Sequence, residues 1–125
     1  MDNPDLENLV STQILNHEYL NKQTRNFSKY FSSKYRILKI SGKLEKWFEL
    51  DFSIFINELN KSIKSGKGEI LQKKDEFEWM ELFEENKKKV LDLKAQIDET
   101  DKEIDRIVYE LYGLTEEEIQ IVENN

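Results

Sequence analysis

The chain has 125 residues, of which 36% are charged, and 26 acidic against 19 basic residues give a formal net charge of −7. Because it contains no cysteine, disulfide scaffolds, cysteine-ligated zinc sites and thiol catalysis are excluded. No apolar run approaches the roughly 18 residues that a membrane span needs, and no signal-peptide pattern opens the chain, so we expect a cytoplasmic protein with no membrane partner.

The composition favours an all-α fold with a thin core. Only 38% of the residues are hydrophobic, below the usual fraction of globular chains, but two tryptophans, five tyrosines and seven phenylalanines can still bury a large area. Four glycines and one proline are too few for the many turns of a sheet fold. We therefore expect a small number of long helices.

The N-terminal segment predicts one long helix. Asn3 is a suitable N-cap, Pro4 fits the first helical position and Asp5 complements the helix dipole. Apolar residues then recur at intervals of three and four, which predicts a helix over about residues 4–34. The stretch 13–19 fits this pattern least well and could contain a break.

The middle of the chain predicts a short helical block. Residues 35–40 fit either a short extended piece or a helix end, and Ser41 with Gly42 predicts a turn. Residues 44–50 have helical apolar spacing, and Asp51 is a plausible N-cap for a helix over residues 52–63. The segment 65–70 contains two glycines and is expected to form a hinge.

The C-terminal half carries a heptad pattern over about four heptads, which predicts a long helix over residues 71–112. Asn86 and Thr100 are polar interruptions of the pattern. Gly113 is a natural residue to end this helix, and Thr115 with Glu118 forms a capping box for a short helix over residues 116–122. The expected helix-packing seam consists of Phe83, Val90, Leu93, Ile97, Ile104, Ile107 and Leu111.

A long heptad helix cannot bury its seam alone, so we expect it to pack antiparallel against the N-terminal helix in a coiled-coil-like hairpin. Polar seam residues such as Asn86 and Thr100 set register and partner at a cost in stability, which favours a monomeric hairpin over a homodimer. The chain is then a single helical module, residues 1–125, with a basic half (1–64), a hinge (65–70), and a heptad helix with a terminal helix (71–125).

Charge is segregated along the sequence. Residues 22–46 contain eight basic residues and one acid, whereas residues 98–123 contain ten acids and two bases. Cations in a row on an exposed helix could neutralise DNA phosphates, the sequence-independent part of DNA binding. The alternative is a solvated face whose charges are paired with the acidic half, and the sequence leaves both open. The candidate DNA-backbone residues are Lys22, Arg25, Lys29, Lys34, Arg36 and Lys39.

No residue pattern predicts a catalytic or metal site. His17, the single histidine, has no serine or cysteine at a spacing that would indicate a catalytic pair. Asp98, Asp101 and Asp105 share a helical face, but such acidic runs are usually solvated. We therefore expect no catalytic residue, no metal and no cofactor in this chain.

The final stretch resembles a known family. Residues 93–119, above all residues 104–118 with Glu78, Trp79 and Met80, are similar to the C-terminus of large bacterial and archaeal restriction-modification enzymes. These enzymes are type IIG-like, class I S-adenosylmethionine-dependent adenine-N6 DNA methyltransferases. Residues 44–52 resemble the segment that precedes this region, and the resemblance spans roughly residues 14–122.

The resemblance implies a non-catalytic C-terminal fragment that follows the target-recognition region of a larger enzyme. S-adenosylmethionine is implied for that parent enzyme, which could also cleave DNA, and the rest of the parent would be the partner of this module. The Asn-Pro-Pro-aromatic motif that holds the target adenine is absent, since Asn3-Pro4-Asp5-Leu6 departs from it at two positions. The alternative function is a stand-alone coiled-coil module for protein–protein interaction.

Overall fold

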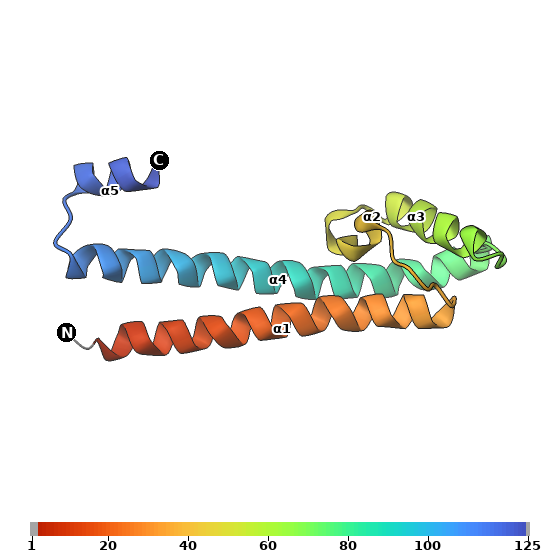
Figure 1. Cartoon of the computed structure of the whole chain (residues 1–125), viewed down its shortest axis with the longest axis horizontal. Coiled ribbons are helices and arrows are strands. Elements are labelled where there is room, and N and C mark those ends of the chain that lie inside the picture. Colours follow the sequence, from red (N-terminus) through yellow and green to blue (C-terminus); the bar gives the residue numbers. More distant parts are fainter. Residues whose placement is uncertain (1–2, 125) are drawn as a thin grey trace. The chain divides into compact units, whose positions relative to one another are not determined.

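The computed structural model describes residues 3–124, and within them every regular element is a helix. The elements are α1 (Pro4–Lys34), α2 (Gly42–Glu45), the short 3-10 helix η1 (Trp47–Glu49), α3 (Phe52–Ser65), α4 (Lys73–Leu111) and α5 (Glu116–Glu123). The predicted all-α class is confirmed, and α1 packs against α4 as the expected helical hairpin (Figure 1).

Two compact units make up the chain, and both long helices contribute to each of them. Unit 1 contains Met1–Glu18 with Lys94–Asn125, and unit 2 contains Tyr19–Leu93. Residues 65–70, the expected hinge, therefore lie inside unit 2. In each unit a segment of α1 lies beside a segment of α4 with the opposite chain direction (Figure 1).

Unit 2 holds an aromatic core. The ring of Phe55 on α3 stacks on that of Phe83 on α4, with 4.6 Å between centroids. Phe27 on α1 packs against Trp47 at 4.4 Å, and the Trp47 indole nitrogen donates a hydrogen bond to the carbonyl oxygen of Thr24 at 3.2 Å. This core explains why a chain with few apolar residues still folds, because each buried ring removes a large area from water.

The middle block is organised by helix caps. Asp51 caps α3 as predicted, since its side chain accepts a hydrogen bond from the backbone N–H of Ile54 at 2.9 Å. Ser41 does more than mark a turn, because its hydroxyl accepts from the N–H of Leu44 and begins α2. Residues 35–40 contain neither helix nor strand.

Residues 13–19, where a break in α1 was predicted as possible, form continuous helix. A buried polar contact explains why the apolar pattern is interrupted there. Gln13 is only 7% exposed, and its side-chain nitrogen donates to the carbonyl oxygen of Ile97 at 2.8 Å and to the carboxylate of Asp101 at 2.6 Å. The apolar pattern is interrupted here because a hydrogen-bonded glutamine takes the place of an apolar residue in unit 1. Buried polar groups need such partners.

The heptad seam follows the prediction except at its end. Phe83, Val90 and Ile97 are buried, and Leu93, Ile104 and Ile107 are half-buried. Leu111 remains 43% exposed. With Gln13 opposite Ile97 and Asp101 in an antiparallel pair, Leu111 lies beyond Pro4, the first residue of α1.

Asn86, a polar interruption of the seam, is paired across the hairpin in unit 2. Its side-chain oxygen accepts a hydrogen bond from the Gln23 side-chain nitrogen at 2.8 Å, and its own nitrogen donates to the carbonyl oxygen of Leu82 at 2.8 Å. A shift of either helix would break the bond between the two side chains. The pair therefore selects one register of α1 on α4, as polar seam residues do in coiled coils.

Three helices end with one residue in the left-handed region, where φ is +55° at Arg36, +62° at Lys67 and +64° at Gly113. At the end of α4, the N–H of Leu114 donates to the carbonyl oxygen of Tyr109, and that of Gly113 to Glu110. This pair of bonds is a Schellman motif, and Arg36 and Lys67 sit in the same arrangement. Glycine was expected at such positions, but only Gly113 fits that expectation.

The left-handed backbone at Gly113 predicts a conformational cost for any side chain. We expect Gly113→Ala to lower the free energy of unfolding by about 1 kcal/mol, although an added Cβ would meet no atom within 4 Å. Gly42→Ala is the matched control, since its Cβ also has open space and its φ is not in that region. Urea unfolding followed by circular dichroism measures both, and equal losses would contradict the explanation.

The Gln23–Asn86 pair predicts a non-additive double-mutant cycle. Gln23→Leu should cost about 1–2 kcal/mol of unfolding free energy, because it leaves the Asn86 side-chain oxygen without its donor. The double variant Gln23→Leu with Asn86→Leu should return to within about 0.5 kcal/mol of the parent, since both polar groups are then replaced. Additive losses in urea unfolding would mean that the two side chains do not depend on each other.

Candidate nucleic-acid interface

The six candidate cations all belong to unit 2 and are all exposed. Lys22, Arg25, Lys29 and Lys34 lie on α1, whereas Arg36 and Lys39 lie in the segment between α1 and α2. Within residues 3–124, no ion pair involves any of the six. Their charges are therefore available to an external anion.

Three cations of α1, Lys22, Arg25 and Lys29, share a helix side that is turned away from the core. Lys34 lies at the edge of that side, because it follows the buried Phe27 by seven residues and approaches Trp79. Lys22, Asn26, Lys29 and Ser33 recur at intervals of four, three and four and form a row along the helix. Phe27 and Phe31 occupy the opposite side and are buried. We call this exposed side, together with Tyr30 and Lys34 at its edge, the basic face, and it consists of Lys22, Arg25, Asn26, Lys29, Tyr30, Ser33 and Lys34.

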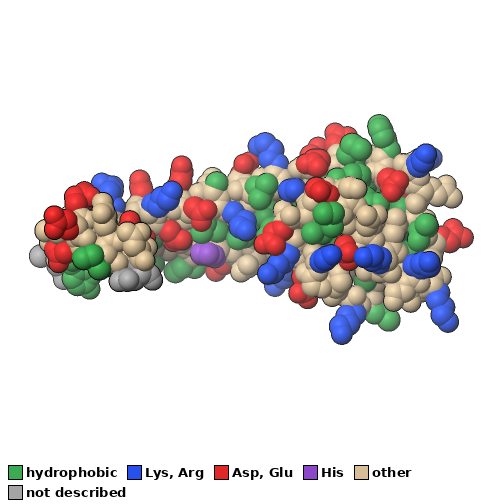
Figure 2. Space-filling model, turned by 90° about the horizontal axis from the view of Figure 1, so that it is seen from above, with side chains coloured by type: hydrophobic (Ala, Val, Ile, Leu, Met, Phe, Trp, Pro, Cys, Tyr) green, Lys and Arg blue, Asp and Glu red, His purple; other side chains and the backbone are tan. Residues whose placement is uncertain are grey.

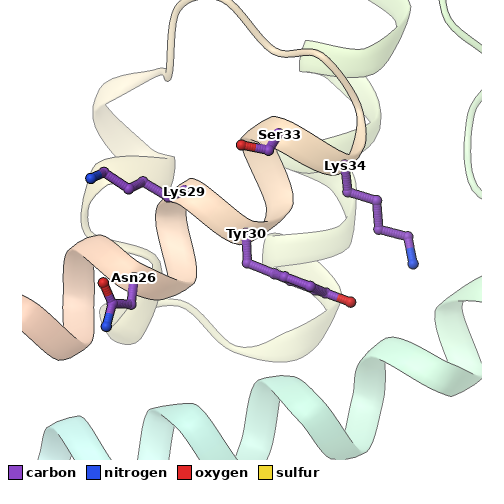
Figure 3. A pocket seen from close by; sticks show the side chains of 5 residues that line it. All are labelled: Asn26, Lys29, Tyr30, Ser33 and Lys34. Carbon is purple, nitrogen blue, oxygen red and sulfur yellow. The ribbon is translucent and has the colours of Figure 1, made fainter.

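The surface of the basic face is shallowly hollowed. One depression is lined by Asn26, Lys29, Tyr30, Ser33 and Lys34, all from α1 (Figure 3). A second depression is lined by Tyr19 and Lys22 of α1 and by Lys89 and Asp92 of α4. The Asp92 carboxylate therefore lines the same depression as one candidate cation, Lys22. The candidate contacts predicted from the sequence did not include Asn26, Tyr30 and Ser33, although their spacing of four and three residues places them beside the lysines.

The aromatic core holds part of the basic face in place. The Tyr30 ring packs edge-to-face against Trp79, with centroids 5.6 Å apart, and the Lys34 ammonium lies 5.9 Å from the Tyr30 centroid and 5.8 Å from that of Trp79. The Trp79 indole nitrogen donates to the Tyr35 hydroxyl at 2.6 Å. Burial raises the pKa of that hydroxyl, against the lowering effect of the Trp79 hydrogen bond.

The acidic stretch belongs to the other unit. Residues 1–18 and 94–125 of unit 1 contain 14 acids and three bases, whereas residues 19–93 of unit 2 contain 16 bases and 12 acids. On the face seen in Figure 2, acidic side chains gather over α5, whereas acidic and basic side chains are interspersed over α2 and α3.

Within unit 1, the acidic part of α4 lies beside residues 4–18 of α1, which contain no lysine or arginine. Its contacts are local: Arg106 pairs with Glu110 at 3.8 Å on the same helix, and Asp101 accepts from Gln13. In the described chain, no ion pair links residues 98–123 to the candidate cations.

The other residues considered in the sequence are not assembled into a site. His17 is exposed on α1. Among residues 3–124, no group of three histidine, aspartate or glutamate side chains is arranged to hold a metal ion. In that same part of the chain, no helix combines the length and the apolar character needed to cross a membrane.

Comparisons with known proteins give one family. A family model described as "Domain of unknown function (DUF8810)" matches residues 2–108, and because this is most of the chain, the protein belongs to that family. Neither the curated proteins nor the solved structures contain a significant match.

Arg36 offers a way to remove one candidate cation without weakening the fold. Because its φ is +55°, Arg36→Gly should raise the free energy of unfolding by about 1 kcal/mol, relieving the cost of a side chain in this region. Arg36→Ala is the matched control, since it removes the same charge and keeps the Cβ. Equal stability of the two variants in urea unfolding would show that the left-handed backbone carries no such cost.

Proposed function

We propose that this member of the DUF8810 family is a non-catalytic helical module that binds the nucleic-acid backbone through the basic face of α1 and the neighbouring cations Arg36 and Lys39. The observation that carries the proposal is the set of exposed cations, none of which is paired with an acid of the described chain. Lysine and arginine on a helix bind phosphates without reading sequence.

The arrangement supports a positioning role. Lys22 and Lys29 are seven residues apart, which is about 10.5 Å along a helix axis, so one helix side can meet several phosphates. The buried aromatic residues behind it keep α1 rigid at this point. Neutralised phosphates release counterions, and this release supplies the binding free energy.

The resemblance to type IIG-like enzymes supplies the context of the proposal. In that context the module is cytoplasmic, follows the target-recognition region of an S-adenosylmethionine-dependent adenine-N6 DNA methyltransferase, and supports recognition by holding the backbone. The parent enzyme would provide the cofactor and the chemistry. The strongly acidic unit 1 would be repelled by DNA, which favours contact through unit 2 alone.

A salt-dependent titration of the full chain with duplex DNA tests the proposal. Binding should weaken steeply with salt: if all six cations contact phosphates, the slope of log affinity against log salt should be about −5. The triple variant Lys22→Glu, Arg25→Glu, Lys29→Glu should abolish binding. Arg36→Gly should lower the magnitude of the slope by about 1.

The matched control changes the same amount of charge elsewhere in unit 2. Lys64→Glu, Lys67→Glu and Lys74→Glu alter three exposed lysines outside the basic face, and this variant should retain most of the affinity. If both triple variants bind equally weakly, net charge rather than the basic face governs binding. No binding by the parent protein would favour the alternative of a protein–protein interaction module.

A further inference from the structure

We propose that the depression around Tyr30 binds single-stranded nucleic acid, with one unstacked base lying on the Tyr30 ring. The inference rests on the proposed function and deepens it, because it names the class of nucleic acid that this part of the basic face prefers.

The exposure of Tyr30 is the first argument. Tyr30 is 49% exposed and lines a depression with Lys29 and Lys34, so the part of the ring that is not packed against Trp79 is open to a ligand. A duplex keeps its bases paired inside and offers mainly phosphates to such a surface. Single strands expose the faces of their bases, and proteins bind them with cations interleaved with aromatic rings.

The second argument is that the ring is held in position before any ligand arrives. Trp79, which is 3% exposed, packs edge-to-face against Tyr30, and the Trp79 indole is itself anchored by its hydrogen bond to Tyr35. The Lys34 ammonium lies on the same side of α1, 5.9 Å from the Tyr30 centroid (Figure 3). A ring held in this way loses little conformational entropy when a base stacks on it.

The neighbours of Tyr30 suit the other parts of a nucleotide. Lys29 and Lys34 are five residues apart, about 7.5 Å along the helix axis, so they can reach phosphates on either side of a base. Asn26 and Ser33 line the same depression and carry hydrogen-bonding groups that accept or donate to any base edge. The combination predicts a preference for single strands with little sequence selectivity.

The test compares three ligands of equal length by fluorescence anisotropy: labelled oligothymidylate, an abasic strand and a duplex. The full chain should bind oligothymidylate most tightly, because only this ligand offers both phosphates and free bases. Tyr30→Leu, which keeps an apolar contact with Trp79, should weaken oligothymidylate binding by about 5- to 150-fold. It should leave binding of the abasic strand and the duplex unchanged, and Tyr30→Phe should retain the affinity.

Tyr112→Leu is the matched control, since Tyr112 is 78% exposed and belongs to the acidic unit 1; it should change nothing. Equal affinity for oligothymidylate and duplex, with no effect of Tyr30→Leu, would overturn this inference and leave the proposed function standing. Equal weakening of all three ligands would overturn it too, because Tyr30 would then act only through the fold. Failure to bind any of the three would overturn both proposals.

Discussion

Each long helix has an apolar side that it cannot bury by itself, and the antiparallel pairing of α1 with α4 answers this constraint in both units. Apolar contact alone would allow the helices to slide by one heptad, about two turns, because a heptad seam repeats every seven residues. Polar bonds across the pair remove that freedom: Gln13 meets Asp101 in unit 1, and Gln23 meets Asn86 in unit 2. The caps and the aromatic block of the middle segment are then held against one defined surface.

The pairing also decides which side of α1 is available for binding. Phe27 and Phe31 of α1 are buried in the core of unit 2, so the opposite side of this helix faces solvent. Lys22, Arg25 and Lys29 lie on that exposed side. The acids of residues 98–123 belong to unit 1, and within residues 3–124 no ion pair joins these cations to an acid. A chain that is acidic overall can thus offer a local surface suited to phosphates, since binding depends on the nearby potential and net charge gives only the average.

Much of the fold could be predicted from local signals. The start of α1, the Asp51 cap, the Gly113 stop and the capping box of Thr115 with Glu118 all depend on residues within one helical turn of each other. The prediction from local signals failed at helix ends where a residue other than glycine takes the left-handed conformation. Lys67 rather than Gly66 or Gly68 takes the left-handed conformation at the end of α3, because the helix hydrogen bonds fix which position must turn, whatever residue occupies it.

By itself the sequence determined the helical class, the caps of several helices and the row of cations on α1, because these depend on spacing and on short-range bonds. Membership of the family is also a property of the sequence alone. Tertiary structure decided what the pattern left open: that Gln13 is buried within a continuous helix, that Leu111 stays 43% exposed, and that Tyr30 packs against Trp79. These outcomes join residues more than 40 positions apart in the chain, and no periodicity within one helix carries information about which side chain another helix will place against it.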